Sequence, residues 1–178
     1  MTKQNSFITK LNNEQKRERL VFFAKKQIGK PYKWGVKKSE IGKFFDCSSF
    51  TQYLYKRIGI ELPRTTVLQA YHGEAIKAAQ KPPFFQEKDL KIGDLLFFKS
   101  EKGHYTKEFP NGIGHIAMYL GDGKFIHAST DKGVPRYSIG LDLKNKVMSG
   151  KESGVKIENF SKITNRKDFQ VAKRILKD

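Results

Sequence analysis

The chain holds a single cysteine, Cys47, at the start of an apolar pattern with helical spacing. Cys47, Phe50, Leu54 and Ile58 follow one another at intervals of three, four and four, which is one face of an α-helix. Asp46 is a residue type that caps helices, so the pattern predicts Cys47 in the first turn. Unsatisfied backbone N–H groups and the helix dipole there favour the thiolate, which is the nucleophilic form. The alternative is a structural cysteine that packs as a small hydrophobe.

Two histidines lie in a predicted β-hairpin, in which a Gly-Asp-Gly turn joins two apolar runs. A two-residue loop would pair Gly121 with Lys124 and put His115 and His127 on opposite faces of the sheet. A three-residue loop would pair Leu120 with Lys124 and put both histidines on the same face, near enough to interact. The second glycine of the turn suits the left-handed position of a three-residue loop, so the same-face arrangement is available.

Together these residues match the requirements of a catalytic thiol. Such a thiol needs a base to take its proton, and the base needs a third group to hold its orientation and tautomer. With Cys47 as nucleophile and His115 as base, His127 fits the third role, because a neutral imidazole accepts a hydrogen bond from the other ring. Each histidine alone is more simply an ordinary polar residue, so the hypothesis depends on all three meeting in space.

Five motifs in a fixed order make the chain resemble the NlpC/P60 cysteine peptidases. They are Asp46-Cys47-Ser48-Ser49-Phe50, Leu62-Pro63-Arg64-Thr65, Gly93-Asp94-Leu95-Leu96-Phe97-Phe98, Gly114-His115-Ile116-Ala117-Met118-Tyr119-Leu120-Gly121 and Phe125-Ile126-His127-Ala128-Ser129. The likeness runs from about Leu20 to the C-terminus. It implies a papain-like α+β fold, with N-terminal helices packed on a central antiparallel sheet. It also implies hydrolysis of peptide bonds in peptidoglycan stem peptides through a thioester acyl-enzyme, commonly at a γ-D-glutamyl bond to a diamino acid.

The resemblance also implies roles for single residues. By position, Cys47 is the nucleophile, His115 the base and His127 the third polar member. Tyr32, in Pro-Tyr-Lys-Trp-Gly, matches the family's tyrosine beside the thiol, where its hydroxyl helps to bind the oxyanion. The backbone N–H of Cys47 is the other expected donor. The residues implied to line the substrate groove are Asp46, Ser48 and Arg64.

The remaining patterns predict one catalytic domain over residues 14–178, preceded by a flexible arm over residues 1–13. Apolar spacing predicts a first helix from Glu14 that ends near Gly29, and the cysteine helix should end near Ile58. The other expected elements are a helix at 66–79 and strands at 95–98, 115–120, 124–128, 155–157 and 169–176. The segment between Phe98 and Gly114 is longer than in compact members, and within it His104-Tyr105 would rim the groove or form a lid.

The composition restricts the partners. Lys and Arg total 35 against 18 Asp and Glu, a net charge of +17 that favours polyanions such as cell-wall polymers. No nucleic-acid motif accompanies the charge, so nucleic acid is not an expected partner. One cysteine excludes an internal disulfide and a Cys-rich zinc site, and we expect no metal and no cofactor. Apolar runs are too short for a membrane-spanning helix, and the first residues lack the apolar region of a signal peptide.

We therefore expect a monomeric cysteine peptidase of the cell envelope, or a secreted one. An acyltransferase of the same superfamily would share the thioester and pass it to an acceptor other than water. A non-catalytic wall-binding or polyanion-binding module would explain the charge but not the presence of Cys47, His115 and His127 together. A toxin delivered to other bacteria would use the same chemistry on another target.

Overall fold

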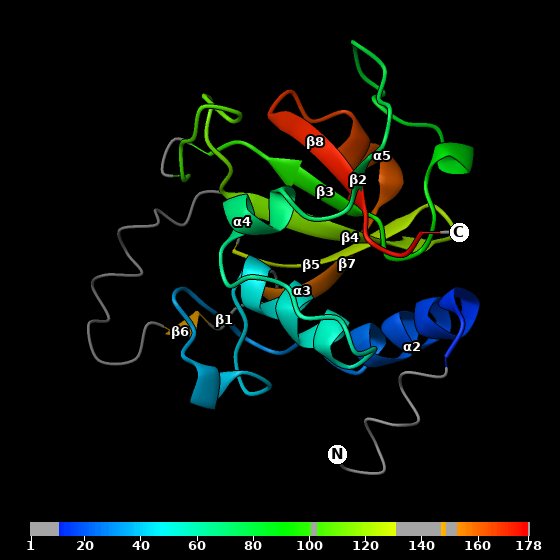
Figure 1. Cartoon of the computed structure of the whole chain (residues 1–178). Helices are drawn as coiled ribbons and strands as arrows, with labels where there is room; N and C mark the ends of the chain where they lie inside the picture. Colours follow the sequence, from blue (N-terminus) through cyan, green and yellow to red (C-terminus); the bar gives the residue numbers. More distant parts are fainter. Residues whose placement is uncertain (1–10, 101–102, 131–146, 149–152, 178) are drawn as a thin grey trace.

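The computed structural model describes residues 11–100, 103–130, 147–148 and 153–177, and its centre is an antiparallel sheet (Figure 1). The sheet has six strands in the order β2-β8-β3-β4-β5-β7. Their bounds are β2 Glu74–Ala75, β3 Leu95–Phe98, β4 His115–Gly121, β5 Lys124–Ser129, β7 Gly154–Asn159 and β8 Phe169–Arg174. β1 (Tyr32–Lys33) and β6 (Val147–Met148) pair separately. The predicted strands are therefore confirmed, with small shifts at their ends.

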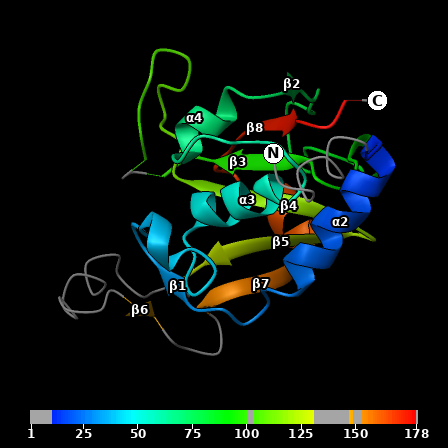
Figure 2. The same cartoon turned by 60° about the horizontal axis from the view of Figure 1, so that its bottom comes forward.

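Helices pack on both faces of this sheet, so the α+β prediction is confirmed. The α-helices are α2 (Asn13–Lys25), α3 (Cys47–Lys56), α4 (Thr66–Ala70) and α5 (Phe160–Thr164), and the 3₁₀ turns are η1 (Lys38–Glu40) and η2 (Glu87–Asp89). α3 lies across one face (Figure 2), where it packs against Ile116, Met118 and Ile126. α5 contributes Ile163 to a second apolar cluster on the other face. Among the described helices, none has the length and apolar character needed to span a membrane.

α3 forms where the apolar spacing predicts it. Phe50, Leu54 and Ile58 are fully buried, and burial of each such side chain contributes about 1.5–3 kcal/mol. The helix ends at Lys56, and Gly59 then takes a φ of +79°, which a glycine adopts without steric cost. Cys47 is thereby fixed as the first residue of a helix that is anchored to the sheet along its length.

The first helix is shorter than predicted. α2 runs from Asn13, and its N-cap Asn12 accepts a hydrogen bond of 2.9 Å from the Gln15 N–H. It ends at Lys25 instead of near Gly29, and Ile28, which the pattern placed on the buried face, is 49% exposed. The predicted arm lies almost wholly outside the described residues.

The helix predicted for residues 66–79 is wrong beyond Ala70, where α4 ends. At Gly73 the chain has a φ of +77°, and a Cβ there would lie 2.4 Å from the Arg174 carbonyl oxygen. The chain then forms β2, in which Glu74 pairs with Arg174. Contact with a distant strand thus determines this segment, and local helix propensity does not.

The hairpin turn also differs from the prediction. Gly121 pairs with Lys124, as in a two-residue loop, and not Leu120 with Lys124. The register then shifts, so that Tyr119 lies opposite Phe125. Leu120 is therefore the extra residue of a β-bulge, which moves the rest of β4 by one position relative to β5. Beyond the bulge the pairing is the one that the three-residue loop would have given, so His115 and His127 lie on the same face of the sheet.

A buried ion pair joins β8 to the start of β3. Arg174 donates from Nε to Asp94 Oδ1 at 3.0 Å and from Nη2 to Oδ2 at 2.7 Å. Asp94 is 2% exposed and also accepts a hydrogen bond of 2.7 Å from the Lys91 N–H. This pair holds two neighbouring strands of the sheet together, and its carboxylate is shielded from water.

Candidate active site

Cys47 is held at the N-terminus of α3 by a reciprocal cap. The Ser49 N–H donates to Asp46 Oδ1 at 2.7 Å, and the Asp46 N–H donates to Ser49 Oγ at 2.9 Å. These bonds satisfy backbone donors that a helix start otherwise leaves without partners. The predicted position of Cys47 in the first turn is confirmed.

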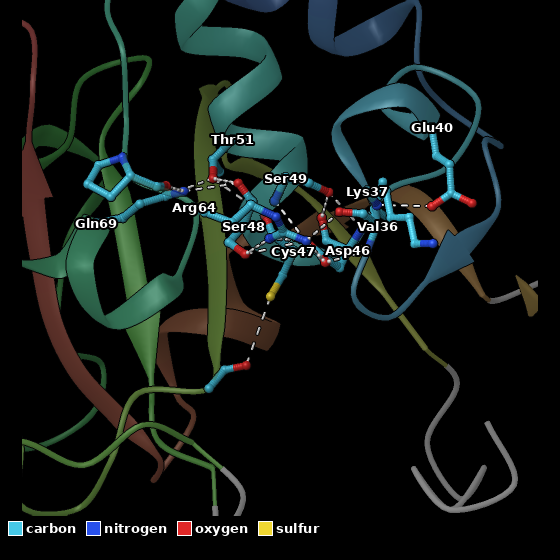
Figure 3. Close-up of polar contacts among 12 residues, drawn as sticks. Val36, Lys37, Glu40, Asp46, Cys47, Ser48, Ser49, Thr51, Arg64 and Gln69 are labelled. Atoms are coloured by element: carbon cyan, nitrogen blue, oxygen red, sulfur yellow. Dashed lines mark hydrogen bonds and ion pairs between the residues drawn. The ribbon is translucent and has the colours of Figure 1, made fainter. Parts of the chain in front are cut away.

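The residues expected to line the substrate groove bind one another (Figure 3). Arg64 Nη1 donates to Ser48 Oγ at 2.8 Å and to Asp46 Oδ1 at 3.1 Å, and Nη2 forms an ion pair with Asp46 Oδ2. Arg64 Nη2 also donates to the Val36 carbonyl at 3.0 Å. All three predicted residues line the cavity beside Cys47. Their mutual bonds make this wall rigid, because the charges are already paired.

Gln69 stabilises the same wall, and sequence reasoning missed it. Its side chain donates to the Ser48 carbonyl at 3.0 Å and to the Pro63 carbonyl at 2.8 Å. It accepts from Thr51 Oγ1 at 2.7 Å and is fully buried. It thus ties α3 to the segment that carries Arg64. A single glutamine within a predicted helix gives no sequence signal for such a role.

The sulfur of Cys47 points away from this polar cluster, as Figure 3 shows. Sγ lies 3.9 Å from the carbonyl oxygen of Gly114, the residue directly before His115. A Cβ at Gly114 would lie 2.2 Å from Ser100 Cβ, so only glycine lets the chain pass here. Cys47 is 8% exposed and lines a cavity of about 410 Å³. His104 lines the same cavity, whereas Tyr105, the other residue predicted for the rim, is not part of its lining.

The two histidines predicted to share a face lie together. His115 Nε2 is 2.8 Å from His127 Nδ1, and the ring centroids are 5.0 Å apart. This is the hydrogen bond expected between a base and the group that orients it. Because Nε2 of His115 faces His127, the ring nitrogen left to face a thiol is Nδ1, which lies nearer the backbone.

His127 is 3% exposed, and burial is the main cause that lowers its pKa from the ordinary value. The Glu158 carboxylate, with Oε2 3.7 Å from His127 Nε2, acts in the opposite direction. Ser129 Oγ lies 3.4 Å from the same nitrogen. The net direction is downward, so the ring is neutral at neutral pH. Sequence reasoning missed Glu158, because only the pairing of β5 with β7 brings it here.

A second cavity, of about 840 Å³, is lined by both histidines. It shares Tyr32, Trp34 and Gly114 with the cavity that holds the thiol. Tyr32 is placed there by a bridge to Phe45, whose N–H donates to the Pro31 carbonyl at 3.2 Å. Tyr32 therefore lies at the junction of the two cavities, close in space to the start of α3.

The thiol and the imidazoles reach this junction from opposite sides of the sheet. Cys47 packs in the cluster on the α3 face. His115 shares its strand face with Ala117 and Tyr119, which belong to the cluster on the α5 face. The sulfur thus approaches β4 at the end of the strand, beside Gly114, and not over the face that carries the rings.

Known proteins resemble this chain in sequence and in fold. The sequence model of a family described as NlpC/P60 matches residues 29–165. A probable endopeptidase p60 of Listeria innocua is 36% identical over 115 residues, which are 65% of this chain and 20% of that protein. A γ-D-glutamyl-L-lysine dipeptidyl-peptidase of Bacillus cereus is 35% identical over 61% of this chain and 27% of its own length. The chain thus spans only a fifth to about a quarter of these relatives.

A solved structure has the same fold. It is the NlpC/p60 domain of the peptidoglycan hydrolase SagA, which aligns with a TM-score of 0.56 and 29% identity. The alignment covers 89% of this chain and 97% of that one. The likeness therefore extends over almost the whole of an isolated catalytic domain.

Proposed function

Since the chain belongs to the NlpC/P60 family, we propose that it is a cysteine peptidase that hydrolyses peptide bonds in the stem peptides of bacterial peptidoglycan. The observation that carries the proposal is the 2.8 Å contact between His115 and His127 beside Gly114, whose carbonyl lies 3.9 Å from the thiol. The names of the endopeptidase and dipeptidyl-peptidase relatives support the same class of reaction. Such a substrate requires the protein to work in the cell envelope or outside the cell.

In the proposed mechanism Cys47 is the nucleophile and His115 the base. Nδ1 of His115 takes the thiol proton, and the sulfur adds to the peptide carbonyl. The Cys47 N–H and the Tyr32 hydroxyl stabilise the oxyanion. The intermediate collapses to a thioester as His115 returns its proton to the leaving amine. A water molecule, activated by the same ring, then hydrolyses the thioester and frees the carboxylate.

This proton transfer assigns a side of the junction to each half of the substrate. The leaving amine receives its proton from His115, so it belongs in the larger cavity that the histidines line. The acyl half then belongs in the cavity of Cys47, where Asp46, Ser48 and Arg64 form the wall. These three residues act on the substrate through the shape and rigidity of that wall.

The larger cavity favours an anionic leaving group. Among the described residues, its wall holds four basic and two acidic side chains. Both acids are paired: Glu158 lies 3.7 Å from Lys156, and Asp168 accepts from Arg166 at 2.9 Å. The excess positive charge comes from the two exposed lysines of the wall, Lys99 and Lys162. A diamino acid that carries an extra carboxylate fits this wall better than lysine does, which refines the proposed γ-D-glutamyl–diamino acid bond.

Replacing both Lys99 and Lys162 by glutamine should weaken selection of such a leaving group. We expect kcat/KM for a γ-D-glutamyl–meso-diaminopimelate peptide to fall about fivefold, since exposed charge pairs contribute up to about 1 kcal/mol each. The matching γ-D-glutamyl–L-lysine peptide should be cleaved as before. The exposed Lys124, outside the cavity wall, gives the control Lys124→Gln. Equal losses on both peptides would contradict the assignment.

The proposed activity itself is tested with purified peptidoglycan sacculi. Digestion followed by mass spectrometry of the soluble products should show new amino termini on diamino acids and matching γ-D-glutamyl carboxylates. A transferase would instead give products that carry the added acceptor. Sacculi and defined stem peptides that remain intact at high protein concentration would refute the proposal.

A further inference from the structure

We propose that Glu158 is a positioning residue that fixes the tautomers of both imidazoles, so that His115 presents an unprotonated Nδ1 to the thiol. The inference rests on the proposed function only for its kinetic consequence. Its structural content, the proton positions on two rings, is open to direct measurement.

The carboxylate of Glu158 and the rings of His127 and His115 lie in a row. Glu158 pairs with Phe125 across β5 and β7, and so shares the strand face of His127. Its Oε2 lies 3.7 Å from His127 Nε2, while His127 Nδ1 is 2.8 Å from His115 Nε2. His127 Nδ1 thus faces His115, whereas His127 Nε2 faces Glu158 and also Ser129 Oγ, which lies 3.4 Å away.

The carboxylate sets the direction of this chain of contacts. It only accepts hydrogen bonds, whereas the Ser129 hydroxyl beside it can donate or accept, so the negative charge of Glu158 favours the neutral His127 ring with its proton on Nε2. His127 Nδ1 is then an acceptor, and the contact with His115 requires the proton of that ring on Nε2. His115 Nδ1 is left with a free lone pair, which a base needs. The reverse tautomer would put a proton on His115 Nδ1, where it could not accept one from Cys47.

The surrounding charges give Glu158 a second effect. The titratable and charged groups around His127 are His115 from β4, Lys156 and Glu158 from β7, and Lys162 and Arg166 from α5 and the segment after it. The cations disfavour a positive charge on the rings. Glu158 favours it and raises the pKa of His127 against the effect of burial. When the thiol proton moves to His115, the carboxylate therefore stabilises the imidazolium.

Glu158→Gln tests the proposal, because the amide has the same shape and its NH₂ can donate to His127 Nε2. We expect kcat to fall about tenfold with KM unchanged. This loss is smaller than the loss caused by replacing the residue that contacts the catalytic base directly, because Glu158 acts through His127. The acidic limb of the kcat/KM pH profile should move about half a unit to one unit lower, because loss of the negative charge lowers the imidazolium pKa and His115 acts as base only when it is unprotonated. A purely structural role would leave the pH profile in place.

Nitrogen NMR of the histidine rings reads the tautomers without any substrate. In the wild type both rings should carry the proton on Nε2, and in Glu158→Gln a population protonated on Nδ1 should appear. The matched control is Glu61→Gln, which removes the same charge from an exposed position. Wild-type His127 protonated on Nδ1, or a Glu158→Gln protein with unchanged tautomers and pH profile, would overturn the proposal. If no peptidoglycan substrate is cleaved, the proposed function fails while the NMR result still decides the tautomers.

Discussion

Replacing Cys47 by alanine is expected to lower kcat for stem-peptide hydrolysis by a factor of about 10⁴ to 10⁶, as in other triads that lose their nucleophile. The sulfur is the atom that forms the thioester, and the chain has no second cysteine to replace it. Release of new amino termini from purified peptidoglycan measures the loss.

The same variant should keep its fold. Cys47 is almost buried, so loss of the sulfur should change the unfolding free energy by only about 1 kcal/mol. His115→Ala should cause a loss of activity of similar size. Because the two residues act as one unit, the double variant should be no worse than either single variant. Multiplicative losses, or a Cys47→Ala protein that still hydrolyses stem peptides at a rate near that of the wild type, would contradict the proposed dyad.

Asp94→Ala is expected to lower the unfolding free energy by about 3 kcal/mol, since removal of one partner of a buried ion pair leaves an uncompensated charge. Asp94 is the more deeply buried partner, and Arg174 also donates at 3.1 Å to the Asp89 carbonyl, which is not a charged group. Denaturant unfolding followed by circular dichroism measures the change. The loss should appear as a lower midpoint with an unchanged slope.

An exposed ion pair nearby provides the comparison. Glu74, which lies opposite Arg174 in β2, pairs with Lys177 at 2.7 Å, and both side chains are exposed. Glu74→Ala should cost no more than about 1 kcal/mol, because solvent screens the pair. Similar losses in the two variants would show that burial does not set the strength of the Asp94–Arg174 pair.

Patterns close together in the sequence predicted their structures well. The spacing of Phe50, Leu54 and Ile58, with Asp46 as cap, was enough to place Cys47 at the start of a helix, because helix formation there depends on near neighbours. The strand at 95–98 was equally clear, since a short continuous apolar run suits a strand buried on both faces.

Features that depend on distant residues were not predictable. The short α4 results from the close approach of Gly73 to Arg174, and neither residue signals the other in the sequence. The shared face of His115 and His127 was predicted, but for the wrong turn, because a bulge leaves no local signature. Glu158 looked like an ordinary charged residue until the register of β5 against β7 was known.

The two cavities that meet at Gly114 are built from different parts of the chain, which affects how the specificity of the proposed peptidase can evolve. The wall beside the thiol comes mainly from the segments before Val67, whereas the wall beside the imidazoles comes mainly from β5, β7, α5 and the segment after α5. In the proposed enzyme, mutations in the wall beside the thiol would therefore change which acyl half is accepted, and recognition of the leaving amine would stay the same. A chimera that exchanges only the C-terminal segments of two relatives should inherit its product preference from one parent and its donor preference from the other.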